Sequence, residues 1–137
     1  MTTLTDEELI RHFEACTLDP SRFPHREHVR LGWLYLRRLP LTEAVATFST
    51  GLRAFATALG KPDRYHETIT WAYLLIIQDR MARGPAGGSW EAFAAANTDL
   101  IASGRQVLER YYQPETLDSP LARASFVWPD RLPRIRS

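Results

Sequence analysis

The sequence predicts an all-α protein: an antiparallel bundle of four main helices, one or two short helices and an irregular C-terminal tail. Three observations lead to this fold class. Apolar residues recur at three- and four-residue intervals, prolines and glycines separate these segments, and no useful stretch alternates apolar and polar residues. The connections between the segments are short, which favours antiparallel neighbours.

The first predicted helix begins at a capping box formed by Thr5 and Glu8. Leu9, Phe13 and Cys16 then follow on one helical stripe. We therefore expect Cys16 to be a small core residue on this helix.

The second and third helices are delimited by prolines and a glycine. The second begins near Pro24 and ends before Pro40, and the third begins with Thr42 as its cap and ends at Gly60. The third helix carries a regular apolar face: Val45, Phe48, Leu52, Phe55 and Leu59.

The fourth helix is predicted over about residues 64–81, with Asp63 as its cap. Residues 69–77 are apolar nearly all round, so we expect this helix to lie centrally. A fifth helix is predicted over 90–102, with a break at Asn97, and the tail begins at Gln113.

Length and charge set limits on the function. The 137 residues fit a single helical domain, residues 1–137, and 17 basic against 16 acidic side chains leave no charge pattern for nucleic acid or an anionic membrane. One cysteine excludes an intrachain disulfide and a CxxC motif. No secretory signal and no apolar run of membrane length are present, so a cytoplasmic protein is expected, with self-association left open.

The segment PHREHV carries two histidines at the start of the second helix. His25 and His28 are three residues apart and therefore project from one helix face. Gly32 continues that face, where its missing side chain leaves room for a ligand or for a close helix contact.

The segment YHETITWAY carries a third histidine, His66, beside Glu67. If the two helix starts meet, His25, His28 and His66 form a metal site, with Glu67 or Glu27 as a carboxylate. Three protein ligands with an open position are typical of a catalytic metal site, and Zn²⁺ or Fe²⁺ is expected.

Other side chains are candidates for proton transfer or substrate binding. Tyr65, Tyr35 and Tyr73 could donate a proton, and Arg123 could bind a carboxylate or, alternatively, cap carbonyls and pin the tail. The catalytic residues expected are Glu67, Tyr65 and Arg123. Five aromatic residues are candidates for an apolar pocket: Trp33, Trp71, Tyr73, Trp90 and Phe93.

The segments FPHREHVRLGWLYLR, YHETITWAY and SPLARASFVWPDRLP resemble a group of small uncharacterised bacterial proteins along most of the chain. The shared pattern is F-x-H-x-x-H-V, then Y-H-E-T, then S-P-x-A-R…P-D. The resemblance implies one whole-chain domain and emphasises the histidines, Tyr65, Glu67 and Arg123, without implying a reaction.

Three functions are open on the sequence. The first is a metal-dependent enzyme acting on a small molecule, and the second is a metal-free isomerase, cyclase or lyase that uses His28 or His66 with Glu67. The third is a ligand-binding or interaction module whose histidines are structural. No nucleotide or flavin signature is present, and the zincin and nucleophile-elbow motifs are missing.

Overall fold

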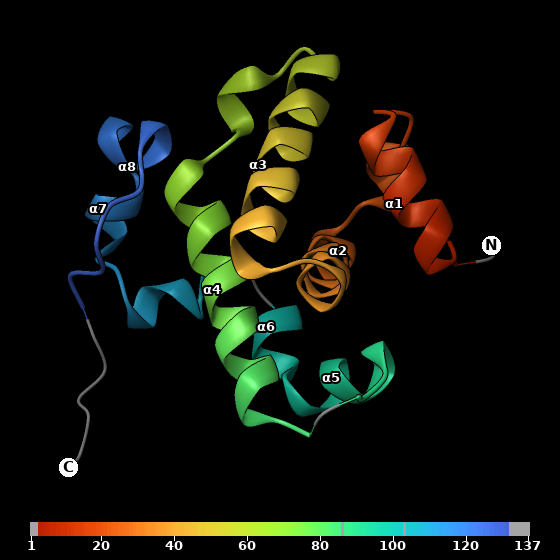
Figure 1. Cartoon of the computed structure of the whole chain (residues 1–137). Helices are drawn as coiled ribbons and strands as arrows, with labels where there is room; N and C mark the ends of the chain where they lie inside the picture. The colour runs from red at the N-terminus through yellow and green to blue at the C-terminus, as the bar shows by residue number, and fades with distance from the viewer. Residues whose placement is uncertain (1–2, 86, 103, 132–137) are drawn as a thin grey trace.

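Helices in this protein begin and end where capping residues, prolines and glycines stand. The structure, a computed structural model, describes residues 3–85, 87–102 and 104–131 (Figure 1). No strand occurs among these residues, and the all-α class is confirmed. The helices are α1 (Asp6–Glu14), α2 (His25–Arg38), α3 (Leu41–Ala58), α4 (Glu67–Arg83), α5 (Trp90–Ala96), α6 (Thr98–Ala102), α7 (Pro114–Leu117) and α8 (Pro120–Ala124), with 3-10 turns at Pro20–Arg22, Pro62–Arg64 and Leu108–Arg110.

Several predicted helix ends are confirmed. The Thr5 hydroxyl accepts from the backbone N–H of Glu8, and the Glu8 carboxylate accepts from that of Thr5, which completes the capping box. Gly60 follows α3 with a φ of 72°, a conformation that favours glycine. Asn97 separates α5 from α6 at the predicted break.

Two predicted caps were wrong. Thr42 is not the cap of α3, because the helix begins at Leu41 with Pro40 at the N-cap position. Asp63 does not cap α4, because residues 62–64 form a separate 3-10 turn and α4 begins only after His66. Prolines at positions 40 and 62 restrict the backbone and decide both boundaries.

The prediction for Cys16 was also wrong, since α1 ends at Glu14. Cys16 lies beyond the helix with a φ of 57° and is only partly buried. A residue in the left-handed region cannot continue a right-handed helix, so Cys16 lies outside α1.

The main helices pack around α2. Figure 1 shows α3 and α4 as an antiparallel pair, with α2 crossing them and seen nearly end-on. The helix α2 packs against both members of the pair and against α6. The short helices α7 and α8 lie at the opposite end of the molecule from α1, and α8 packs on α4.

The burial of α2 extends over eight consecutive residues, 29–36. One of them is Arg30, whose guanidinium donates to Asp6 at 2.7 Å and to Glu27 at 2.9 Å. A buried charge needs such partners. The two carboxylates therefore allow a polar side chain on the inner helix, and Asp6 ties α1 to α2.

The helices α1 and α3 approach closely at a glycine. A Cβ on Gly51 would lie 2.4 Å from the Phe13 ring. The absent side chain lets the fully buried Phe13 approach α3 closely, and its ring contacts Phe23 and Phe48 at centroid distances of 5.7 and 5.8 Å.

No helix in the described ranges is both long and apolar enough to cross a membrane.

Candidate functional site

A pocket of about 250 Å³ lies where α2 crosses α3 and α4, and residues 104 and 105 line part of it. Most of its surface is apolar, and its polar side chains include both histidines of α2. We call it the histidine pocket. It is lined by His25, His28, Val29, Gly32, Phe48, Leu52, Ile69, Thr70, Tyr73, Leu74, Ile77, Gly104 and Arg105.

His25 is the first residue of α2, and the chain fixes its ring on two sides. Its Nε2 donates a hydrogen bond of 2.7 Å to the carbonyl of Leu100, so the proton is on that nitrogen. The ring also meets Tyr73 edge-on, with 5.2 Å between centroids. On a neutral ring the other nitrogen, Nδ1, is then an acceptor.

His28 lies one turn further along the same face. Its ring stacks on Phe23 with 3.8 Å between centroids. Burial, together with the nearby His25, lowers the pKa of His28 to about 4, and a hydrogen bond with the Phe23 backbone only partly opposes this. His28 is therefore a neutral imidazole at neutral pH.

Two residues of α4 complete the polar part of the pocket. The Tyr73 hydroxyl donates to the carbonyl of Gly104, and burial raises the pKa of Tyr73 above its usual value. The Thr70 hydroxyl donates to the carbonyl of His66, one turn earlier, at 2.7 Å. Both side chains are uncharged at neutral pH.

Gly32 provides both room for a ligand and a close helix contact, the two uses predicted for it. It lines the pocket, and a Cβ at this position would lie 3.0 Å from Leu74 Cδ2 and 3.4 Å from Ile77 Cδ1. Glycine here therefore permits the close crossing of α2 over α4 and leaves space for a ligand.

His66 does not share this pocket. It is the N-cap of α4: its Nδ1 accepts from the Ile69 backbone N–H at 3.1 Å, and its Nε2 donates to the carbonyl of Leu117 at 2.7 Å. Both ring nitrogens thus hold the backbone, and burial lowers the pKa of His66, which favours the neutral ring that a cap needs.

The predicted three-histidine metal site was therefore wrong. Within residues 3–85, 87–102 and 104–131, no group of three or more His, Cys, Asp or Glu side chains could hold a metal ion. His25 and His28 line one pocket, whereas His66 serves the start of α4. The two carboxylates expected beside them, Glu67 and Glu27, pair with Arg53 and Arg30 at 3.1 and 2.9 Å.

The three residues expected to be catalytic lie together, but none lines the histidine pocket. The Tyr65 hydroxyl donates to the Glu67 carboxylate. Arg53 pairs with that carboxylate and lies over the Tyr65 ring at 4.6 Å. Arg123 donates to the carbonyls of Asp63 and Tyr65, the contacts expected of a residue that pins the C-terminal segment.

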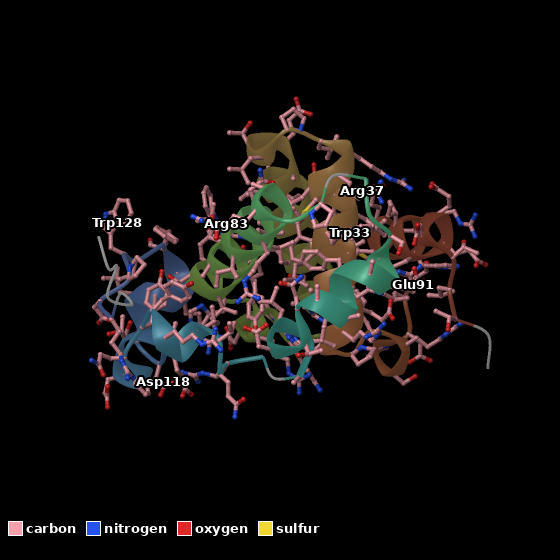
Figure 2. The ribbon with its side chains drawn as sticks, turned by 90° about the horizontal axis from the view of Figure 1, so that it is seen from below. Trp33, Arg37, Arg83, Glu91, Asp118 and Trp128 are labelled. Carbon is pink, nitrogen blue, oxygen red and sulfur yellow. The ribbon has the colours of Figure 1, made fainter. Side chains whose placement is uncertain are left out.

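The remaining tyrosine candidate, Tyr35, donates to Glu14 at 3.0 Å and lies outside the pocket lining. Of the five aromatic candidates, only Tyr73 lines the histidine pocket. Trp33 and Phe93 line a second pocket of about 400 Å³ beside residues 80–85 and 87–89, where Figure 2 shows Trp33 next to Arg37.

Sequence reasoning missed Thr70 as a site residue, although Ile69, Thr70 and Tyr73 follow His66 on one helical face and supply a signal. It also missed Phe23 and Arg105, and no local pattern marks either of them. Arg105 comes from a loop far along the chain, and only the tertiary structure brings it to the pocket.

Comparison of the chain with protein-family models, curated proteins and solved structures finds no significant match.

Proposed function

We propose that this protein is a small-molecule enzyme that binds its substrate in the histidine pocket and moves a proton within it, without a metal. The observation that carries the proposal is that one apolar pocket holds two imidazoles from a single helix face, His25 held by a backbone carbonyl and His28 stacked on the Phe23 ring. A largely apolar cavity with a few placed polar groups is the usual form of a ligand site.

The chemistry follows from the neutral state of His28. Its free ring nitrogen can accept a proton from a bound molecule, and burial disfavours the imidazolium that forms. The proton then returns to another atom of the same molecule, with His25 as the second group able to carry it. Such a shift needs no co-reactant and fits an isomerase or cyclase, or a lyase if a bond breaks.

The backbone takes the orienting role that the sequence led us to expect of Glu67. The carbonyl of Leu100 holds His25, and the Phe23 ring stacks on His28. A fixed tautomer and ring orientation favour proton transfer, because the accepting nitrogen is already in place. In this proposal His66, Glu67, Tyr65 and Arg123 support the fold.

A second candidate is a metal held by His25 and His28 alone, since both side chains line one pocket. Zn²⁺ or Fe²⁺ would need its other ligands from water or substrate. Titration of the protein, prepared without a histidine tag, with each ion tests this candidate: binding that is lost in both His25→Ala and His28→Ala supports it.

The experiment for the metal-free enzyme is a fragment screen by ligand-observed NMR, followed by deuterium exchange. Uncharged carbonyl fragments of ring size are expected to bind, and to exchange the hydrogen next to the carbonyl for deuterium faster than in buffer. His28→Ala should lose the exchange, whereas His12→Ala, on α1, should keep it.

The outcomes of this experiment distinguish an enzyme from a ligand-binding module and from a protein that does not use this pocket. Binding without exchange would leave a ligand-binding module, the non-catalytic alternative. Binding that persists in both His28→Ala and His25→Ala, or no binding at all, would remove the pocket as the functional site.

A further inference from the structure

One arginine lines the histidine pocket, and no aspartate or glutamate occurs among the described lining residues. This arginine, Arg105, follows α6 in the chain, and its side chain is 44% exposed. The pocket therefore meets solvent beside a positive charge. Most of the remaining wall is apolar.

The backbone next to Arg105 is fixed against the pocket. The carbonyl of Gly104 accepts a hydrogen bond from the Tyr73 hydroxyl of α4. A Cβ on Gly104 would lie 3.8 Å from Nδ1 of His25, so the glycine lies against that ring. Gly104 and Arg105 are thus at the end of the pocket where α2 begins, and His28 follows one turn further along α2.

The guanidinium of Arg105 has donors left for a ligand. Its Nη1 donates to the Asp118 carboxylate at 2.9 Å. A guanidinium carries five N–H groups, so Nε and Nη2 can bind a second carboxylate. Asp118 is 65% exposed, and Figure 2 shows it at the edge of the molecule. Because an exposed ion pair contributes little energy, Asp118 competes only weakly with a bound anion.

We propose that the ligand is a small carbonyl compound that carries a carboxylate, and that Arg105 binds this carboxylate where the pocket opens. This inference rests on the proposed function, because it names the substrate class of the same pocket. A carboxylate at the exposed arginine stays hydrated, so its charge is not buried. The volume sets the size of the apolar body: a cavity of about 150 Å³ holds benzene, and the histidine pocket, at about 250 Å³, holds one ring with substituents.

The carboxylate adds orientation to binding. An uncharged carbonyl fragment uses only the apolar part of the pocket and binds without the arginine. A carboxylate bonded to Arg105 holds one end of the ring at the opening, so a carbonyl at the other end is directed inward, towards His28. The sequence suggested carboxylate binding for Arg123, which instead donates to the carbonyls of Asp63 and Tyr65.

Three acetyl compounds of similar shape test the ligand class by calorimetry on the full chain. 4-Methylacetophenone is uncharged, 4-acetylbenzoate is an anion, and 4-acetylbenzylammonium is a cation. We expect the anion to bind at least threefold more tightly than the uncharged compound, about the effect of one partly exposed ion pair. The cation should bind at least threefold more weakly than the uncharged compound. Because salt screens exposed charges, the advantage of the anion should shrink in high salt.

The variant Arg105→Gln removes the charge and should abolish the preference for the anion, while the uncharged compound still binds. Arg110→Gln is the matched control and should keep the preference, because Arg110 is also exposed, pairs with Asp99 at 3.1 Å and is not part of the pocket lining. Asp118→Asn removes the competing carboxylate and should tighten binding of the anion only. In the wild-type protein, 4-acetylbenzoate should shift the Nε–H resonance of Arg105, a measurement that needs no variant.

The two proposals fail differently. If none of the three compounds binds, the pocket is not the ligand site and the proposed function falls. If the uncharged compound binds as tightly as the anion, or if Arg105→Gln keeps the preference for the anion, the pocket stands as the ligand site and the carboxylate-bearing class is overturned.

Discussion

At the scale of single residues, the three histidines of the two motifs have different environments and different tasks. His28 contacts an aromatic ring and an apolar pocket, and burial keeps it neutral. His66 contacts two backbone groups and caps a helix. Residue type and spacing alone did not distinguish them, because the difference comes from the partners that the fold supplies.

The pKa of His28 predicts how stability depends on pH. The ordinary pKa is 6.5 and the folded value is about 4, so between these values the unfolded chain binds the extra proton. Stability is therefore fully present above pH 6.5 and declines as the pH falls to about 4, by a contribution on the order of 3 kcal/mol. Urea unfolding of wild type and His28→Asn at several pH values measures it. The difference between the two proteins should shrink across this window, and a constant difference would contradict the assignment.

At the scale of helices, caps and close contacts decide where each element begins and how near it lies to the next. The regular apolar face of α3 and the capping box of α1 could be predicted from the sequence, because both depend on residues that are close together along the chain. The start of α4 could not be predicted from the sequence, because histidine is an unusual cap. The second hydrogen bond of the His66 ring also reaches the carbonyl of Leu117, 51 residues away.

Replacing His66 tests its role as a cap. His66→Ala removes a helix cap and a buried hydrogen bond, and should lower the unfolding free energy by about 1–3 kcal/mol. His66→Asn keeps an oxygen able to accept from Ile69 and should recover part of this loss. Urea unfolding measures both variants, with binding of the carbonyl fragments from the screen as the second readout. Loss of fragment binding in a folded His66→Asn protein would show that His66 belongs to the functional site after all.

Gly51 tests the contact between α1 and α3. An alanine methyl would overlap the Phe13 ring, whose nearest atom would be 2.4 Å away, and overpacking of a core costs about 1–3 kcal/mol. Gly51→Ala should therefore lower the melting temperature despite the better helix propensity of alanine. Gly60→Ala is a useful comparison: nothing lies within 4 Å there, so any loss comes from its φ of 72° alone. An unchanged melting temperature for Gly51→Ala would mean that α1 can move away freely.

At the scale of the whole molecule, the helical class and the separate segments followed from periodicity, prolines and glycines. The arrangement of the pocket did not. His25 and His28 were marked by their spacing, but Arg105 and the carbonyl of Leu100 come from the other half of the chain. The expected meeting of two helix starts failed because α2 crosses α4 and meets it in the middle, where Gly32 faces Leu74 and Ile77.

Towards the C-terminus, α8 and the residues that follow it pack on α4 (Figure 1). Thr68 is fully buried; its hydroxyl donates to the Ser125 carbonyl at 2.7 Å and accepts from the Val127 N–H at 3.1 Å. Beyond these bonds Trp128 is 81% exposed and projects outward (Figure 2). The attachment therefore includes polar anchors as well as apolar contacts, such as that of Phe126 with Trp71.

Thr68→Val keeps the shape of the side chain and removes both bonds, leaving one donor and one acceptor of the tail without a partner. Each costs about 1–3 kcal/mol if it stays buried, or the segment detaches so that water can satisfy it. We expect faster amide exchange at Val127 and faster proteolysis of residues 125–131 than in the wild type. Thr68→Ser retains the hydroxyl and should protect the segment nearly as well, although it loses a methyl group. If Thr68→Val protected the segment equally, apolar contacts alone would hold the tail, and the hydroxyl would have no anchoring role.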